Sequence, residues 1–207
     1  MGIYASYVLP RLMDRALQSP VVAAERAKCV PRASGRVLEV GIGSGLNLPF
    51  YRPTVETLCG LDPSVDLWRL ATARVARTPF PVEFVGASAE RLPIADASFD
   101  AVVTTFTLCT IPDPPAALGE ISRVLKPDGR LLFVEHGRAP DARVCGWQDR
   151  LTPLWRRLAG GCHLNRKIDE LIVSAGFSIV EMDARYSAFP KLLGYFFSGT
   201  ATRSLIT

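Results

Sequence analysis

A run of closely spaced glycines stands soon after a short apolar segment. The apolar segment is Arg36–Leu38, and after Glu39 and Val40 the glycines alternate with other residues over Gly41–Gly45. Glycines between a strand and the next segment let the backbone approach a ligand closely. A second apolar run, Leu58–Leu61, is followed by the acidic Asp62. A carboxylate at this edge of a parallel sheet can accept hydrogen bonds from a ribose diol, so the pattern predicts a nucleoside site.

The spacing of the glycines distinguishes two classes of nucleoside cofactor. Glycine occupies Gly41, Gly43 and Gly45, and Leu46 stands where a dinucleotide-binding turn has its third glycine. A branched side chain there obstructs the close approach that a pyrophosphate requires, which disfavours a hydride-transferring dehydrogenase. We therefore predict S-adenosylmethionine, whose ribose diol needs an acceptor such as Asp62 and whose other end carries no phosphate.

Five short motifs follow one another along the chain. They are Glu39–Gly45, Leu61–Ser64, Gly86–Pro93, Phe99–Phe106 and Arg123–Arg130. In this order they resemble the motifs of class I S-adenosylmethionine-dependent methyltransferases, over roughly residues 35 to 200. Ser88 stands where that family usually has Asp, and Asp128 replaces a turn glycine. The resemblance implies a Rossmann-like fold with S-adenosylmethionine as methyl donor and S-adenosylhomocysteine as product.

Different residues are expected to contact different parts of the cofactor. The ribose motif includes Asp62, and the glycines pass under the methionine moiety. Glu39 is expected to help fix the amino group indirectly, and Asn47 to hydrogen-bond near the carboxylate. Thr105 would flank the methionine end, and the segment that begins at Ser88 would border adenine. The full predicted set is Glu39, Gly41, Gly43, Gly45, Asn47, Asp62, Pro63, Ser88, Ala89 and Thr105.

Residues after the fourth and fifth expected strands would meet the methyl acceptor, because ligands lie beyond the carboxyl ends of parallel strands. His136 ends the fifth strand, and Gly137 leaves room beside it. A thiol acceptor must lose its proton, and a neutral imidazole can take it, so His136 is the candidate general base. A histidine that only hydrogen-bonds within the sheet is the alternative. Cys109, Trp147 and His163 are the candidates for the acceptor pocket.

The five cysteines are widely scattered. They are Cys29, Cys59, Cys109, Cys145 and Cys162. Their odd number and their spacing indicate neither a disulfide framework nor a metal site, and they fit a reducing compartment. Cys162 and His163 are adjacent residues of metal-ligating types, but nothing in the sequence completes the set. We therefore predict no metal.

One segment combines basic residues with tryptophan. Between Arg143 and Lys167 the only acid is Asp149, and Trp147 and Trp155 are interleaved with the basic residues. Two interpretations stay open. The segment could meet anionic lipid at a membrane surface. We favour the other, a solvated helix face whose tryptophans pack inward.

Composition bounds the class of protein. A chain of 207 residues, 48% of them hydrophobic, fits one domain with a full core. The net charge of +4 is too mild to indicate nucleic acid as a partner. No run reaches the ~18 apolar residues of a spanning helix. We expect a cytoplasmic protein with at most a weak, peripheral membrane contact, and the oligomeric state is left open.

Strands and helices are expected to alternate, which predicts an α/β fold with a doubly wound, mostly parallel seven-stranded sheet and helices on both faces. Residues 1–34 form a helical segment broken at Pro10 and Pro20, either a lid over the cofactor or packing outside the sheet. Residues 35–207 form the methyltransferase domain. The expected strands are 37–40, one ending at Asp62, 82–85, 101–106, 130–135, 177–182 and 192–197. The expected helices run from the glycines to Pro49 and over 65–77, 116–125 and 165–175.

The second half of the chain narrows the resemblance. The segments concerned are Leu132–His136, Trp147–Asp149, Pro153–Trp155, Gly161–Arg166 and Gly194–Tyr195. They resemble the microsomal alkyl-thiol S-methyltransferases, which have Asn in place of His163 and an N-terminal membrane anchor for which this sequence has no apolar run. The region is similar, more loosely, to phospholipid N-methyltransferases and quinone-biosynthesis C-methyltransferases. We predict methyl transfer to a small thiol or sulfide. A lipid or quinone acceptor and a non-catalytic S-adenosylmethionine-binding protein are the alternatives.

Overall fold

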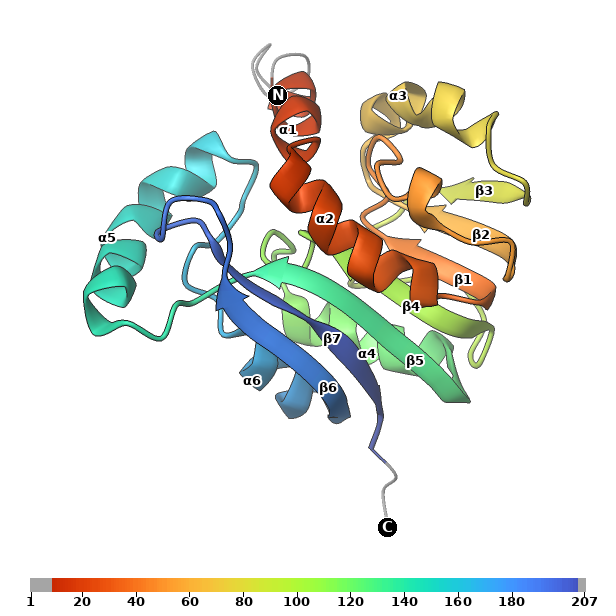
Figure 1. The fold of residues 1–207 in the computed structure, drawn as a ribbon. Helices are drawn as coiled ribbons and strands as arrows, with labels where there is room; N and C mark the ends of the chain where they lie inside the picture. Colours follow the sequence, from red (N-terminus) through yellow and green to blue (C-terminus); the bar gives the residue numbers. More distant parts are fainter. Residues whose placement is uncertain (1–8, 205–207) are drawn as a thin grey trace.

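A single seven-stranded sheet forms the centre of the computed structural model, which describes residues 9–204 (Figure 1). The strand order is β3-β2-β1-β4-β5-β7-β6. The strands are β1 (Gly35–Val40), β2 (Val55–Leu61), β3 (Val82–Val85), β4 (Phe99–Thr105), β5 (Leu125–His136), β6 (Phe177–Tyr186) and β7 (Tyr195–Arg203). The first five run parallel, and β7 is antiparallel to both β5 and β6. The predicted seven-stranded, mostly parallel sheet is confirmed.

Two hydrophobic cores lie on opposite faces of this sheet. Successive strand residues alternate between them, so Val37 belongs to one core and Leu38 to the other. One face is covered by α4 (Pro114–Val124) and α6 (Ile168–Ser174). The other is covered by α2 (Pro20–Cys29) and α3 (Val65–Val75). Strand β4 is buried along most of its length because helices shield it on both sides.

The strand register brings the motifs to one edge of the sheet. Val40 at the end of β1 pairs with Leu61 on β2 and with Thr104 on β4. Thr105 in turn pairs with Val134 on β5. Because these strands are parallel, the residues that follow them meet at their carboxyl ends. The glycine turn, Asp62 and His136 are therefore positioned by backbone pairing.

Local capping explains where α3 and α4 begin. The side chain of Ser64 accepts a hydrogen bond from the Leu67 amide at the start of α3, as the sequence predicted. At the start of α4, Asp113 accepts from the Ala116 amide and Pro114 occupies the first turn. The observed bounds differ from the predicted ones by two residues or fewer at each end.

The sequence predicted a helix directly after the glycines, and that prediction is wrong. Residues 41–47 form turns, followed only by a short 3₁₀ helix, η3 (Leu48–Phe50). Gly45 has φ +75°, which a right-handed helix does not allow. Pro49 also lacks the amide hydrogen that a helix interior requires. The segment is thus a tight loop over the sheet edge.

Several elements of the second half differ from expectation. The last strand is Tyr195–Arg203 rather than 192–197, and α6 begins only at Ile168. Strand β5 begins earlier than expected, at Leu125. The basic tryptophan segment forms α5 (Ala142–Leu158), which holds Pro153 in its interior. The half-exposed strand β6 also extends past the predicted residue 182 to Tyr186, because it lacks a continuous apolar pattern.

The N-terminal segment is helical, as predicted, in the part that the structure describes. Helix α1 (Leu9–Leu17) ends before Ser19, whose side chain caps α2 at Val22. The chain does break at Pro20, but Pro10 stands in the first turn of α1, where a proline is tolerated. The rest of the predicted segment, residues 1–8, lies outside the described residues. A short 3₁₀ helix, η2 (Val30–Arg32), links α2 to β1.

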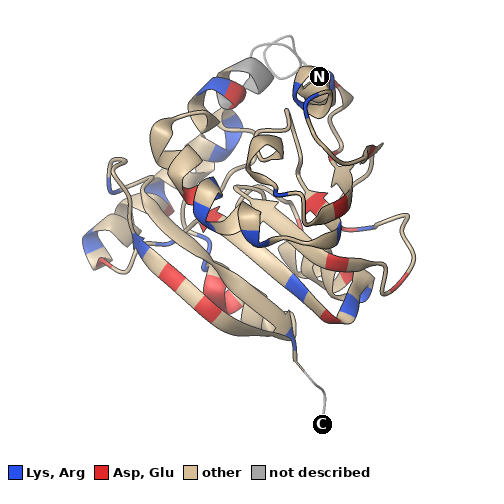
Figure 2. Cartoon of the chain, turned by 45° about the vertical axis from the view of Figure 1, so that its right-hand side comes forward, with Lys and Arg blue, Asp and Glu red and all other residues tan. Residues whose placement is uncertain are grey.

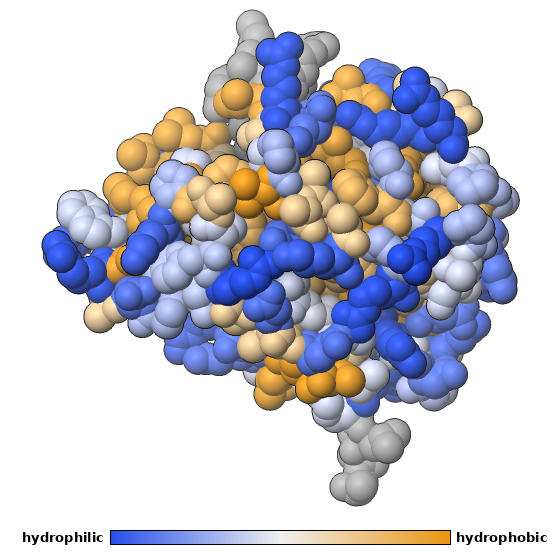
Figure 3. All heavy atoms as spheres, in the orientation of Figure 1, coloured by the Kyte–Doolittle hydropathy of each residue, from blue (hydrophilic) through white to orange (hydrophobic). Residues whose placement is uncertain are grey.

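Charged and apolar side chains are distributed differently over the surface. Basic and acidic residues are interspersed in the view of Figure 2. Apolar side chains gather at the surface over α5 in Figure 3. Trp147, Leu154 and Leu158 of α5 are each more than half exposed. Within residues 9–204 no helix has both the length and the apolar character needed to cross a membrane.

Candidate functional site

The glycine turn owes its shape to backbone angles that only glycine adopts readily. Gly41, Gly43 and Gly45 have φ of +77°, +52° and +75°. The amides of Gly41 and Ile42 both donate to the Leu61 carbonyl oxygen, at 2.8 and 3.1 Å. The turn is thus fastened to the end of β2, beside Asp62. The alternate glycines that the sequence singled out are the residues that allow this path.

Replacing Gly41 by Ala should destabilise the protein. A β-carbon at this position would lie 2.3 Å from Thr107 Oγ1, and φ +77° is strained for alanine. We expect a loss of ~1–3 kcal/mol in the free energy of unfolding, measured by urea denaturation. The matched control is Gly119→Ala on α4, where a β-carbon meets nothing within 4 Å. The control should be neutral or stabilising, and equal effects of the two changes would contradict the strain argument.

Asp62 is held in place by the backbone on either side of it. Its Oδ2 accepts from the Gly43 amide at 3.0 Å and its Oδ1 from the Ser64 amide at 2.8 Å. Burial raises the pKa of this carboxyl group, and the two amide hydrogen bonds oppose that shift. Each oxygen keeps a further lone pair, so the carboxylate can accept from a ligand diol without losing these contacts.

Beneath the turn lies a carboxylate that is almost fully buried. Glu39 Oε1 accepts from Asn47 Nδ2 and Oε2 accepts from the Tyr51 hydroxyl, both at 2.9 Å. Burial raises the pKa of Glu39 to about 7 against the effect of these donors. Asn47 Nδ2 also lies 3.0 Å from Thr105 Oγ1. Three predicted cofactor residues, Glu39, Asn47 and Thr105, are therefore brought into contact with one another.

Arg26 completes this cluster from outside the predicted motifs. Its Nη1 donates to Asn47 Oδ1 at 2.6 Å and to Thr105 Oγ1 at 3.0 Å. We call Arg26, Glu39, Asn47, Tyr51 and Thr105 the buried polar network. Sequence reasoning missed Arg26 because a single basic residue in a helix has no distinguishing local pattern. Asn47 is committed to this network, and its direct contact with a cofactor stays a prediction.

The N-terminal helices lie across the glycine turn (Figure 1). Ser44 Oγ donates to the carboxylate of Asp14 on α1. Arg74 on α3 donates to the Ser44 carbonyl oxygen at 2.7 Å and lies 3.6 Å from Asp14. With Arg26 on α2, these contacts tie both helices to the predicted cofactor site. A lid function stays a prediction that this arrangement favours.

The residues expected near adenine are less enclosed. Ala89 is buried, whereas Ser88 and Pro63 are exposed. Ser88 Oγ contacts the carboxylate of Glu90. Their role at the adenine and ribose therefore stays a prediction.

Phe106 adopts a backbone conformation that is unusual for its type. It follows β4 with φ +55°, in the left-handed region that favours glycine. Its amide donates to the Val134 carbonyl oxygen at 2.8 Å, its ring packs edge-on to Phe196, and the Arg26 guanidinium lies 5.6 Å from its centroid. Such strain persists where the surroundings dictate it, and it often marks functional sites. The sequence held no signal of it.

The structure brings the predicted residues His136, Cys109 and His163 together. His136 is 6% exposed and Cys109 is 2% exposed. The His163 amide donates to the Cys109 carbonyl oxygen at 2.8 Å. Cys162, which the sequence did not place in the pocket, joins them with its Sγ 3.7 Å from Cys109 Sγ and 3.8 Å from His136 Nδ1. The hydrogen bond with the Cys109 thiol lowers the pKa of Cys162.

Glu135 supports this cluster from the adjacent position on β5. Its carboxylate is fully buried and accepts from the amides of Thr107 at 3.1 Å and Cys109 at 3.3 Å. Burial raises the pKa of Glu135 to about 7, and these amide contacts oppose the shift. The carboxylate thereby holds the loop that carries Cys109 against the end of β5.

The fold also completes a set of metal-ligating side chains. Cys109 Sγ, His136 ring nitrogen and Cys162 Sγ all lie within 4.8 Å of one another. The pair Cys162 and His163 is not completed, but Cys162 belongs to a different set. Cys162 was paired in the sequence with its neighbour His163, whereas in the structure its partners come from β5 and from the loop after β4.

Trp147 does not join this cluster. It is 55% exposed on α5, with Arg150 stacked 5.6 Å from its ring. It lines a surface cavity of about 500 Å³, together with Asp141, Arg143, Val144, Leu151, Lys191 and Leu192. The favoured interpretation of inward-packed tryptophans is wrong for Trp147, because the inner face of α5 is occupied by residues such as Gln148. Its predicted place beside Cys109 and His163 has no support.

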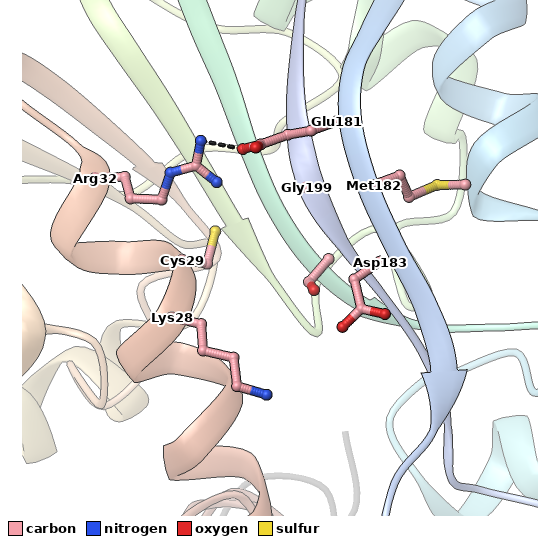
Figure 4. Close-up of a pocket in the computed structure, with 8 residues that line it drawn as sticks. Lys28, Cys29, Arg32, Glu181, Met182, Asp183 and Gly199 are labelled. Carbon is pink, nitrogen blue, oxygen red and sulfur yellow. Dashed lines mark ion pairs between the residues drawn. The ribbon is translucent and has the colours of Figure 1, made fainter.

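A second cavity lies between α2 and the strands β6 and β7 (Figure 4). It has a volume of about 290 Å³, and an ion pair joins Arg32 and Glu181 across it. Cys29 lines it, and burial raises the pKa of this thiol to about 12. None of the predicted site residues lines this cavity, so it is separate from the cluster at the strand ends.

Comparison with known proteins points to one kind of chemistry. Residues 38–133 match a family described as a methyltransferase domain. Thiol S-methyltransferase TMT1B of Rattus norvegicus is 36% identical over 151 residues, which are 71% of this chain and 62% of that protein. Phosphatidylethanolamine N-methyltransferase of Cereibacter sphaeroides is 36% identical over 149 residues, which are 71% of this chain and 72% of that protein.

A solved structure supports the fold. The S-adenosylmethionine-dependent methyltransferase of Methanosarcina mazei superposes with a TM-score of 0.65 and 21% identity, over 90% of this chain and 98% of that one. At this identity the likeness concerns the fold alone. The chain spans only 62% of the length of TMT1B, so the activity of that whole protein does not transfer directly.

Proposed function

The chain belongs to the S-adenosylmethionine-dependent methyltransferases, and from this premise we propose that it methylates the sulfur of a small thiol. S-adenosylmethionine is the methyl donor. The observation that carries the choice of acceptor is the position of His136 beside two thiols at the end of β5. The 36% identity to a thiol S-methyltransferase supports the same choice.

We propose that the cofactor occupies the edge formed by β1, β2 and β4. Asp62 would hold the ribose diol, since its carboxylate is oriented by the amides of Gly43 and Ser64. The glycine turn would pass under the methionine moiety. The buried polar network would fix the amino group indirectly, through the backbone that it supports. Ala89 and Ser88 would border adenine.

The acceptor site needs to align the nucleophile with the methyl group and to remove one proton. Methyl transfer is an in-line displacement, and alignment of nucleophile and methyl can supply ~7–11 kcal/mol. A free thiol has a pKa of ~8.5, so only a few per cent is thiolate near pH 7. We propose that His136 takes the thiol proton, as an imidazole at the strand end can. The buried surroundings of His136 keep bulk water away from the nucleophile.

Replacing His136 by Asn should reduce kcat/KM for an alkyl thiol most strongly at low pH. At pH 7 we expect a loss of about 30-fold, because that is the gain available from ionising a thiol of pKa ~8.5. The loss should be largest below the thiol's pKa of ~8.5 and become small above pH 9. The measurement is the rate of S-adenosylhomocysteine release across this range.

An acidic aromatic thiol provides the control for this experiment. Such an acceptor is already ionised at pH 7, so the variant should methylate it almost as fast as the wild type does. An equal loss at every pH and with both acceptors would show that His136 does not take the thiol proton. It would then remove the proposed proton transfer from the mechanism.

A lipid acceptor is the second candidate. The identity to a phosphatidylethanolamine N-methyltransferase and the exposed apolar side chains of α5 favour it. In a screen of short-chain thiols, sulfide, phosphatidylethanolamine vesicles and a quinone precursor, turnover only with the vesicles would replace the thiol by the lipid. It would also favour a membrane-peripheral location over a purely cytoplasmic one. Tight cofactor binding without turnover on any acceptor would favour a non-catalytic protein.

A further inference from the structure

Two thiols and an imidazole converge at the end of β5. Cys109 Sγ and Cys162 Sγ are 3.7 Å apart, and Cys162 Sγ lies 3.8 Å from His136 Nδ1 and 3.9 Å from Nε2. The three side chains come from the loop after β4, from β5 and from the loop after α5. Each is therefore anchored by a different part of the fold.

These separations match those between the ligands of a tetrahedral metal ion. Zinc lies ~2.3 Å from cysteine sulfur and ~2.05 Å from histidine nitrogen, so its ligand atoms stand ~3.8 Å apart for two sulfurs and ~3.6 Å apart for sulfur and nitrogen. The observed spacings of 3.7 and 3.8 Å are close to both values. The third separation, between Cys109 Sγ and a His136 ring nitrogen, is within 4.8 Å, so an ion could be held once the side chains turn toward a common point.

We propose that Cys109, His136 and Cys162 bind one thiophilic divalent cation of the zinc class, and that the sulfur of the methyl acceptor takes its fourth position. The second half of this proposal rests on the proposed function. Three protein ligands with one open position are the usual arrangement of a catalytic zinc, whereas structural zinc has four protein ligands.

The surroundings of the cluster suit a cation with one open side. Cys109 and His136 are buried, whereas Cys162 is partly exposed. Glu135 is fully buried next to His136 and holds the Cys109 amide at 3.3 Å, so it both fixes one ligand and adds negative charge nearby. A cation in the cluster would offset the cost of burying this carboxylate.

The reaction at such an ion is balanced without a further reactant. The acceptor thiol binds as a thiolate and releases its proton to water. Its sulfur attacks the methyl carbon of S-adenosylmethionine, the carbon–sulfonium bond breaks, and the electron pair goes to the sulfur of S-adenosylhomocysteine. The methylated product is a neutral thioether, a weaker ligand that leaves. In this form His136 is a ligand, and its role as proton acceptor applies to the metal-free chain.

Titration of the reduced, metal-free full chain with Co²⁺ tests the site directly. We expect one Co²⁺ per chain, the visible bands of a tetrahedral site and thiolate-to-cobalt charge transfer, all lost when Zn²⁺ displaces the cobalt. Cys109→Ser and Cys162→Ser should each weaken binding by more than about 100-fold. Cys145→Ala, which removes a thiol of α5 outside the cluster, should leave binding and spectrum unchanged. S-adenosylmethionine binding by calorimetry shows whether each variant is folded.

The outcomes separate the site from the proposed function. Absent charge-transfer bands in the wild type, or unchanged bands in the variant with both cysteines replaced, would overturn the metal site. With the site loaded, adding an alkyl thiol should shift the bands, and an unaltered spectrum would overturn the fourth-position assignment. A loaded protein that methylates no thiol would contradict the proposed function and leave the metal site standing.

Discussion

Replacing Asp62 by Ala is expected to weaken S-adenosylmethionine binding by ~2–4 kcal/mol, about 30-fold to 900-fold. The carboxylate would lose up to two charge-assisted hydrogen bonds to the ribose hydroxyls. The substitution would also remove the acceptor of the Gly43 amide, which donates to Asp62 Oδ2 at 3.0 Å. Isothermal titration calorimetry at fixed pH and salt measures the change.

Two further variants separate these contributions. Asp62→Asn keeps the shape of the side chain and one acceptor oxygen. We therefore expect its affinity for S-adenosylmethionine to lie between those of the wild type and Asp62→Ala. Asp66→Ala removes an exposed acid from the first turn of α3, where it pairs with exposed Arg69, and should change affinity little. Unchanged affinity in Asp62→Ala would remove this residue from the cofactor site.

Replacing Arg26 by Met should cost ~3–5 kcal/mol in the free energy of unfolding, because one member of a buried charged network is removed. The side chain is 4% exposed and donates to both Asn47 and Thr105. Methionine fills much of its volume but cannot satisfy Asn47 Oδ1 or offset the charge of Glu39. Urea denaturation with a constant m-value measures the loss. Arg69→Met, at an exposed position of α3, should change stability by no more than ~0.5 kcal/mol.

The size of this loss should depend on pH. Burial raises the pKa of Glu39 from its ordinary 4.5 to about 7, and Arg26 opposes that shift. A carboxyl group whose folded pKa is raised contributes stability below pH 4.5 and loses it as pH rises through 7. Without Arg26 the folded pKa rises further. The destabilisation should therefore be largest near pH 8 and smaller near pH 5, where Glu39 is protonated in both proteins.

The double variant Arg26→Met/Glu39→Gln tests this explanation. Removing the buried charge together with its partner should recover part of the stability at pH 8. A pH-independent loss in Arg26→Met, with no recovery in the double variant, would mean that Arg26 acts through packing alone. The experiment also bears on the N-terminal helices, because Arg26 joins α2 to the predicted cofactor site.

Elements with a strong local pattern could be predicted closely. Strand β3 has the predicted bounds Val82–Val85, and Ser64 caps α3 as expected. The loop after Gly45 could not be predicted from the apolar spacing that suggested a helix. Gly45 takes φ +75° in a position where Leu48 and Ala71 leave no room for a β-carbon, and Ala71 is distant in the sequence. Trp147 was misplaced because the residues of α5 do not show which face turns inward.

The sequence alone determined the sheet, the glycine turn and the class of cofactor. These depend on consecutive residues, because strand alternation, glycine backbone freedom and an acid after a strand are local properties. Only the tertiary structure decided that Arg26 meets Asn47, 21 positions away, and that Cys162 meets Cys109, 53 positions away. Such contacts arise where parallel strands end side by side and distant loops fold back over them. The local spacing of residues in the sequence does not predict which distant segments come into contact.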